Sequence, residues 1–110
     1  MSFDEVSYWN NVREMVISQL RTVYDPEMPS VNIFDLGLVY RLEVDYDGKV
    51  ICDHTLTSMV CPFADEICQS ITDAINNVSE VTSVERNLVF DPPFSMEMVS
   101  EETKMMMGWY

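Results

Sequence analysis

Cys61 is the residue best placed for chemistry, because it stands directly before Pro62 and the start of a predicted helix. The first turn of a helix leaves amide groups without intrahelical partners, and proline is well suited to that turn. A nearby thiolate gains about 0.3 to 1 kcal/mol from the helix dipole at an exposed site. Carboxylates such as Asp25, Glu27 or Asp65 would oppose this ionisation. Cys61 is therefore a candidate nucleophile or soft metal ligand, and an ordinary helix-start cysteine is the alternative.

The other two cysteines and the single histidine favour structural roles. Cys68 follows Cys61 by seven residues, about two helical turns, so roughly 10 Å separates their α-carbons and they cannot readily share one ion. Cys52 and His54 fall on the apolar face of a predicted strand, where a cysteine behaves as a small hydrophobe. His54 and Cys61 could form an activated pair, but this face favours a buried, hydrogen-bonded histidine.

The composition excludes several classes of function. The 110 residues include 19 Asp and Glu against 6 Lys and Arg, a formal charge of −13, so nucleic acids and anionic membranes are poor partners. The sequence contains no CxxC, HExxH, P-loop or dinucleotide-binding motif. It has no membrane-length apolar stretch or signal-peptide pattern, and its odd cysteine count argues against a disulfide framework. We therefore expect an acidic, cytoplasmic protein.

The elements that must position these residues follow from hydrophobic periodicity. A three-to-four-residue repeat from Val6 to Val23 predicts a helix over residues 4–23, with Ser2 and Glu5 as its capping box. Alternation predicts strands over 38–44 and 49–57, joined as a hairpin by a turn at 45–48. A second helix follows Pro62 and reaches residue 78, a third strand covers about 81–90, and a short helix runs from 100 to 108.

Two prolines make the acidic segment 25–29 a stiff loop between the first helix and the first strand. The predicted order is therefore α-β-β-α-β-α. This order is typical of an α/β (α+β) fold, with a small mixed sheet of about three strands packed against two to three helices. If the last strand lies parallel to a hairpin strand, the second helix is the crossover. We expect a single domain spanning residues 1–110.

Four short motifs occur in order along the chain: Asp25-Pro26-Glu27, Asp35-Leu36-Gly37-Leu38-Val39-Tyr40, Thr55-Leu56-Thr57-Ser58 leading to Cys61-Pro62, and Asp91-Pro92-Pro93-Phe94. Together they resemble the iron-sulfur cluster assembly proteins related to SufT and to the phenylacetate-pathway protein PaaD. The resemblance covers nearly the whole chain. The chain departs from the family pattern at Met59, Val60 and Phe94, where members usually carry proline, often glycine, and tryptophan, respectively. The further cysteine-bearing region of PaaD-type proteins has no counterpart here, which favours the SufT-like side.

The resemblance implies a small α/β domain that helps assemble iron-sulfur clusters or deliver them to client proteins, rather than an enzyme. It also implies one functional pocket, formed by Asp25, Glu27, Thr57, Ser58 and Cys61. A cluster usually takes four cysteine ligands, and only Cys61 of the three cysteines is well placed. We therefore expect iron or a cluster to be bound transiently, with Cys61 as a shared ligand and no cofactor held tightly by one chain.

Two alternatives from other classes stay open. The first is a metal-free adaptor that links the assembly machinery to its clients. Its methionine-rich residues 105–110 would suit a partner groove or the seam of a homodimer. The second is a thiol enzyme with Cys61 as nucleophile and Asp25 or Glu27 as acid or base.

Overall fold

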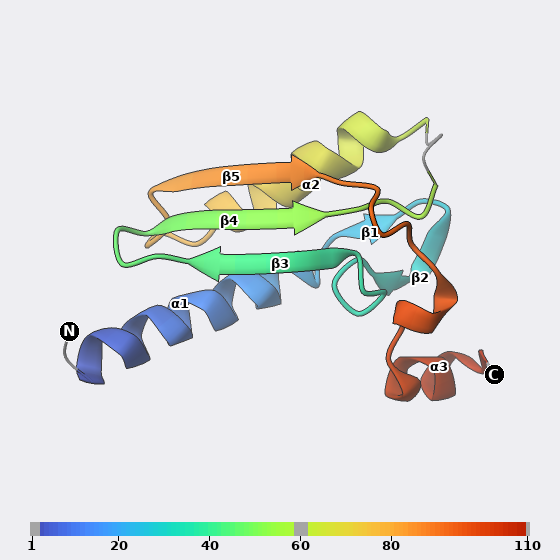
Figure 1. The fold of residues 1–110 in the computed structure, drawn as a ribbon, viewed down its shortest axis with the longest axis horizontal. Helices are drawn as coiled ribbons and strands as arrows, with labels where there is room; N and C mark the ends of the chain where they lie inside the picture. Colours follow the sequence, from blue (N-terminus) through green and yellow to red (C-terminus); the bar gives the residue numbers. More distant parts are fainter. Residues whose placement is uncertain (1–2, 59–61, 110) are drawn as a thin grey trace.

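A three-stranded sheet and a separate two-stranded sheet make up the β structure (Figure 1). The computed structural model describes residues 3–58 and 62–109. The mixed α/β fold and its three-stranded sheet are confirmed, and no helix within the described ranges has the length and apolar character to cross a membrane. In chain order the elements are α1 (Phe3–Leu20), β1 (Tyr24–Asp25), β2 (Met28–Asn32), β3 (Val39–Val44), β4 (Lys49–His54), α2 (Ala64–Asn76), β5 (Ser83–Leu88), the 3-10 helix η1 (Met96–Met98) and α3 (Glu101–Met107).

The main sheet has the order β3-β4-β5, with β4 at its centre. β3 and β4 form the predicted antiparallel hairpin. In its turn, Oδ1 of Asp45 accepts the amide hydrogens of Asp47 and Lys49, both at 2.9 Å, and Gly48 has a φ of 85°. β5 lies parallel to β4, so α2 is the crossover between them, as the sequence predicts. β4 and β5 are shorter than predicted, and β4 ends at His54 rather than Thr57.

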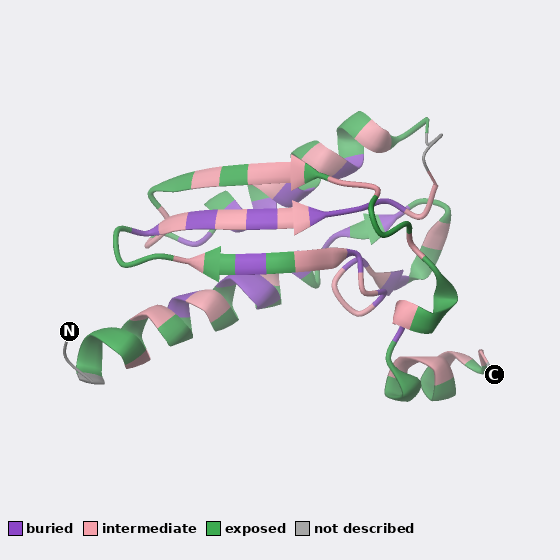
Figure 2. Cartoon of the chain, in the orientation of Figure 1, coloured by how far each residue is buried: buried purple, intermediate pink, exposed green. Residues whose placement is uncertain are grey.

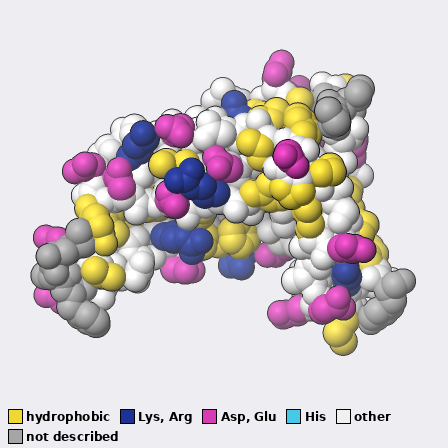
Figure 3. Space-filling model, in the orientation of Figure 1, with side chains coloured by type: hydrophobic (Ala, Val, Ile, Leu, Met, Phe, Trp, Pro, Cys, Tyr) yellow, Lys and Arg dark blue, Asp and Glu magenta, His cyan; other side chains and the backbone are white. Residues whose placement is uncertain are grey.

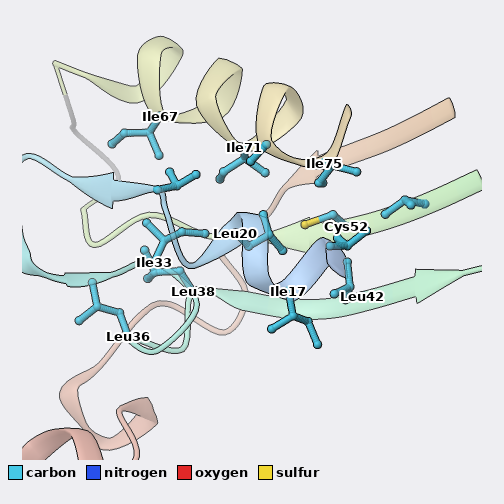
Figure 4. Packing of buried hydrophobic residues seen from close by; sticks show 14 of the residues in the cluster. Ile17, Leu20, Ile33, Leu36, Leu38, Leu42, Cys52, Ile67, Ile71 and Ile75 are labelled. Atoms are coloured by element: carbon cyan, nitrogen blue, oxygen red, sulfur yellow. The ribbon is translucent and has the colours of Figure 1, made fainter. Parts of the chain in front are cut away.

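Both long helices cover the same face of the sheet, and the core lies between the helices and the sheet (Figure 2). In Figure 4, Ile71 and Ile75 of α2 point toward Leu20 of α1 and Cys52 of β4. The uncovered face carries ion pairs, with mixed charges over its centre (Figure 3). This division explains the alternation in β4, whose inward residues are buried. The core includes Val12, Val16, Leu20, Ile33, Leu38, Val50, Cys52, Ile67, Ile71 and Ile75.

The first helix begins within one residue of its predicted start, but it differs from the prediction at its C-terminal end and in the burial of its first turns. It stops at Leu20, and Val23 contributes to the core from the following turn instead. Val6 belongs to the predicted apolar stripe, but its side chain is 39% exposed. The first turns of α1 extend beyond the sheet, so nothing in the sheet covers that part of the stripe (Figure 1). The predicted cap at Ser2 lies outside the described residues.

The acidic proline segment is a β-hairpin rather than a loop, which corrects the prediction. β1 and β2 pair antiparallel with an irregular register at Tyr24 and Asp25, and Pro26 lies in the turn between them. Pro29 falls inside β2. The missing amide of proline is tolerated because a two-stranded sheet consists only of edge strands. The hairpin therefore holds Asp25 at a strand end and Glu27 in a tight turn.

The C-terminal helix forms where its sequence signals predict it. The side chain of Ser100 accepts a hydrogen bond from the Thr103 amide at 3.2 Å. Gly108 ends the helix in the left-handed conformation, with a φ of 73°. An N-cap serine and a left-handed glycine are the usual start and stop of a helix, so α3 is locally specified at both ends.

Candidate functional site

Asp25 is a buried carboxylate at the end of β1, with no solvent-exposed surface. Its Oδ1 accepts the amide hydrogen of Glu27 at 2.9 Å. Its Oδ2 accepts the hydroxyl hydrogen of Thr57, also at 2.9 Å. A buried carboxylate is tolerated when hydrogen bonds replace the water it has lost, and both oxygens are satisfied here. Asp25 therefore joins the β1–β2 turn to the connection that follows β4.

Glu27 approaches the same hydroxyl from the exposed side. Its Oε2 lies 3.4 Å from Oγ1 of Thr57, farther than the Asp25 oxygen. A threonine hydroxyl has one hydrogen to donate, so Thr57 donates mainly to Asp25. The exposed Glu27 carboxylate is only weakly held by this contact and keeps acceptor capacity for another group. Three of the five predicted pocket residues are therefore brought together by hydrogen bonds.

The remaining two predicted pocket residues continue the chain from Thr57. Ser58 is half-buried, next to this cluster in the sequence. Cys61 lies outside the described residues, so its predicted place in the pocket and its role as a metal ligand stay predictions. The helix predicted after it is confirmed, since α2 begins at Ala64.

The start of α2 has mixed consequences for a thiolate nearby. The N-cap residue of α2, Phe63, makes no side-chain capping bond, so it leaves the first amide groups of the helix available. Asp65 and Glu66 occupy the first turn and already complement the positive end of the helix dipole. These two carboxylates oppose a further negative charge, which reduces the stabilisation that the dipole alone would give a thiolate.

His54 is buried and hydrogen-bonded on both sides, as the strand pattern predicts. Arg86 Nη1 lies 3.1 Å from Nε2, and because arginine can only donate, Nε2 must accept. The hydrogen is then on Nδ1, 3.2 Å from the carbonyl oxygen of Thr55, to which it donates. Burial and the nearby guanidinium lower the pKa of His54, which keeps the ring neutral. Its lone pair is occupied, which disfavours a role as base for Cys61.

The two described cysteines differ in environment. Cys52 is fully buried in β4, and burial together with the nearby Asp53 raises the pKa of its thiol to about 12. The predicted structural role of Cys52 is therefore confirmed. Cys68 is half-buried on α2 and lines a hollow of about 400 Å³ together with Thr72 and Arg86. Neither residue belongs to the Asp25 cluster.

The second of the four motifs has a structural purpose that the sequence alone does not reveal. Asp35 closes the turn between β2 and β3 through two bonds with Asn32, at 2.8 and 2.9 Å, and pairs with Arg21 at 3.4 Å. Gly37 has a φ of 85°, and a Cβ there would lie 2.7 Å from the carbonyl oxygen of Met98. Only glycine is accommodated at such a contact. This motif therefore shapes the turn that supports η1.

The fourth motif is attached to the second by one hydrogen bond. The hydroxyl of Tyr40 donates to the carbonyl oxygen of Pro92 at 2.8 Å, and burial raises the pKa of Tyr40. The Asp91–Pro92 peptide bond is cis, and Phe94 packs partly buried against the core. The first and third motifs thus meet at the Asp25 cluster, while the second and fourth meet at Tyr40.

The sequence of the chain matches a known protein family. A family model described as iron-sulfur cluster assembly protein matches residues 13–86. The chain belongs to this iron-sulfur cluster assembly family. The match includes the β1–β2 hairpin, Thr57 and α2, and so contains the whole Asp25 cluster.

Individual relatives favour the SufT-like side of the family, as the resemblance predicts. An Fe-S protein maturation auxiliary factor of Porphyromonas gingivalis is 42% identical over 96 residues, covering 87% of this chain and 90% of the relative. The auxiliary factor SufT of Staphylococcus aureus is 37% identical, covering 78% and 97%. A solved Bacillus anthracis structure, described as domain of unknown function DUF59, superposes with a TM-score of 0.82 at 32% identity, covering 96% and 99%.

Proposed function

We propose that this protein assists the maturation of iron-sulfur proteins by handing iron or a cluster to client proteins, with Cys61 as a transient ligand. The names of the relatives as maturation auxiliary factors support the general role. The observation that carries the site is the Asp25–Thr57 hydrogen bond at 2.9 Å, which ties the acidic hairpin to the segment leading to Cys61. The cluster is the cargo in this proposal, and the client supplies its final ligands.

The ligand chemistry favours a site shared between chains. Clusters are held mostly by four cysteine thiolates, and the sequence has three cysteines. Cys52 is a poor candidate for a ligand because its side chain is fully buried in the hydrophobic core. Within the described part of the chain, no group of three or more His, Cys, Asp or Glu residues is arranged to hold a metal ion. One chain would then offer an incomplete coordination set, which suits delivery better than storage.

The cluster of hydrogen bonds divides two tasks between its carboxylates. Asp25 is buried and each of its oxygens accepts one hydrogen bond, so its task is to hold Thr57 and the start of the following segment in place. Glu27 is exposed, with only a 3.4 Å contact to Thr57, so its oxygens can approach iron as a hard ligand. Ser58 continues from Thr57 toward Cys61 and completes the proposed pocket.

Reconstitution under anaerobic conditions tests the proposal. The protein is incubated with ferrous iron and sulfide, followed by absorption spectroscopy, size analysis and transfer to an apo iron-sulfur client. We expect Cys61→Ser to lose transfer, because the cargo loses its ligand. Cys68→Ser is the matched control, since Cys68 lies outside the Asp25 cluster, and it should transfer normally. Transfer by Cys61→Ser at the rate of the unaltered protein would reject the proposed role of the thiol.

The thiol-enzyme alternative finds less support. It needs a base close to Cys61, but both ring nitrogens of His54 are occupied, by Thr55 and Arg86. Asp25 is buried, and each of its oxygens already accepts a hydrogen bond, which leaves the exposed Glu27 as the remaining candidate for the acid or base. Turnover of a thioester or peroxide that requires Cys61 but no iron would nevertheless favour an enzyme over a delivery factor.

A further inference from the structure

The C-terminal segment exposes apolar side chains that a folded protein normally covers. Met106 and Met105 are 78% and 62% exposed, the highest values among the large hydrophobic residues that the structure describes. Met96, in η1, is 42% exposed. Isolated exposed methionines need no explanation, but these belong to one short segment, close to half-buried Met98 and Trp109. Together these five residues are called the methionine surface below.

The methionine surface is held in a defined conformation by its own anchors. Val99 is 2% exposed and enters the core between η1 and α3. Ser100 and Gly108 fix the two ends of α3, and the Met98 carbonyl lies against Gly37. The helix consequently stands at the end of the sheet (Figure 1). Met105 and Met106 are exposed there, whereas Met107 packs partly buried against the core. The exposure therefore belongs to the folded structure.

Two hollows accompany these methionines. The first has a volume of about 430 Å³, and Phe34, Met98 and Met106 supply its apolar walls. The second has a volume of about 660 Å³ and is lined by Met96 and Trp109, with Glu101 and Lys104 at its sides. The two hollows lie on opposite sides of α3, because Glu102, Thr103 and Met106 line the first, whereas Glu101 and Lys104 line the second. A single partner helix therefore fills only one of them, and the first has room for a large apolar side chain.

The charges around the methionine surface are mainly negative. Glu97, Glu101 and Glu102 all lie in η1 and α3, where Lys104 is the one basic residue and pairs with Glu101 at 3.7 Å. Arg21 also lines the first hollow, but it pairs with Asp35 at 3.4 Å, so Glu102 is the acidic residue there that has no ion pair within the described part of the chain. In Figure 3 acidic side chains border the hydrophobic atoms at α3. The whole chain has a formal charge of −13, so a second copy would be repelled and a basic partner attracted.

We propose that the methionine surface binds a basic amphipathic helix of a partner protein. Apolar side chains on one face of that helix enter the first hollow, between Phe34, Met98 and Met106, while its lysines and arginines face the acidic residues at its edge, above all Glu102. Methionine suits this contact because its flexible, polarisable side chain adapts to different apolar shapes. The inference concerns partner capture and does not depend on iron or on Cys61, so it can hold or fail separately from the proposed delivery function.

A synthetic peptide tests the proposal directly. The probe has about 15 residues, with leucines on one helical face and lysines on the other, and carries a fluorescent label. Its binding to the full chain is measured by fluorescence anisotropy at low and moderate salt. We expect Met106→Gln to weaken binding by about tenfold, because it removes an apolar wall of the first hollow. Met96 lines the second hollow, on the other side of α3, so Met96→Gln should bind normally. We expect Glu102→Gln to weaken it less and to make the affinity less dependent on salt.

Matched controls keep the test specific. Met15 is 47% exposed on α1, so Met15→Gln removes a comparable exposed methionine outside the methionine surface and should bind normally. Glu14→Gln is the corresponding charge control on α1. A scrambled peptide of the same composition should bind at least about tenfold more weakly. Circular dichroism confirms that each variant is folded.

Three outcomes would overturn the proposal. Equal binding of the scrambled peptide would reduce the contact to charge attraction alone. If Met15→Gln weakened binding as much as Met106→Gln, the peptide would not be binding at the methionine surface. Self-association of the chain, or binding to phosphatidylcholine vesicles, that is lost in Met106→Gln would replace the proposed helix with a second copy or a lipid surface.

Discussion

The hydrogen bond from Thr57 to Asp25 gives the sharpest test of the candidate site. Replacing Thr57 with valine keeps the shape of the side chain and removes only its hydroxyl. Oδ2 of Asp25 then loses its donor at 2.9 Å, while Oδ1 keeps the Glu27 amide. Hydrogen bonds to charged groups contribute about 1.5 to 3 kcal/mol, and an unsatisfied buried carboxylate adds to the loss.

Thr57 is itself half-buried, so water partly replaces the lost donor and the lower part of that range applies. We expect Thr57→Val to lower the free energy of unfolding by about 2 kcal/mol. In a chain of 110 residues this corresponds to a fall in Tm of about 10 °C. Urea unfolding followed by circular dichroism measures the difference directly.

Two control variants separate the hydroxyl from other effects. Thr57→Ser keeps the donor and should cost less than about 1 kcal/mol, the loss of one methyl group. Glu27→Gln should change stability by less than about 0.5 kcal/mol, because Glu27 is exposed and its contact with Thr57 is 3.4 Å. Thr57→Val unfolding at the same urea concentration as the unaltered protein would refute the anchoring role of Asp25. An effect of Glu27→Gln as large as that of Thr57→Val would do the same.

Two further predictions follow from the pKa shifts and the thiols. With iodoacetamide near neutral pH, Cys61 should be alkylated first. Cys52 should be alkylated only after unfolding, because burial raises the pKa of its thiol to about 12. Mass spectrometry that shows Cys52 or Cys68 modified first would contradict this order. Burial lowers the pKa of native His54 below its ordinary value of 6.5, so as the pH falls through that region the unfolded chain takes up a proton that the native chain does not. The free energy of unfolding should therefore decline as the pH falls through this window, and it should decline less in His54→Gln. If urea titrations give the same pH dependence for the unaltered protein and for His54→Gln, the assignment to His54 is wrong.

The main sheet was predictable because each of its elements carries its own signal. The alternation around Cys52 and His54 places both residues on the buried face of β4. The helix spacing that includes Ile67 and Ile71 gives the buried stripe of α2. Periodicity of this kind reports which side of an element is covered, and it does so without knowledge of the partner. The exposed Val6 shows its limit, because the pattern cannot say where the covering sheet ends.

The two-stranded hairpin was not predictable from periodicity. β1 has two residues, too few for an alternation to be recognised, and Pro26 and Pro29 normally argue against a strand. Only the pairing in space shows that both prolines occupy positions that need no ladder hydrogen bond. The prediction of a stiff acidic loop captured the rigidity of the segment, but it missed the pairing.

The candidate site was recognised through the family motifs, whereas its chemistry required the structure. Asp25 and Thr57 are 32 residues apart, and nothing in their spacing indicates that they share a hydrogen bond. In a chain with 19 acidic residues, an aspartate is expected to be solvated, yet Asp25 has no exposed surface. Burial therefore distinguishes Asp25 from Glu27, although the sequence presents them as one acidic motif.

That distinction assigns different consequences to the two carboxylates. A buried, doubly bonded carboxylate contributes to stability, and removing it should disturb the segment before Cys61 whether or not iron is present. An exposed carboxylate contributes little to stability, so an effect of Glu27→Gln on cargo transfer would have to arise at the site itself. Unfolding and transfer measured on the same variants can therefore separate support of the pocket from contact with the cargo. If Glu27→Gln lowers transfer while its unfolding is unchanged, the exposed carboxylate acts on iron; if only Thr57→Val lowers transfer, the hairpin serves the pocket purely as a scaffold.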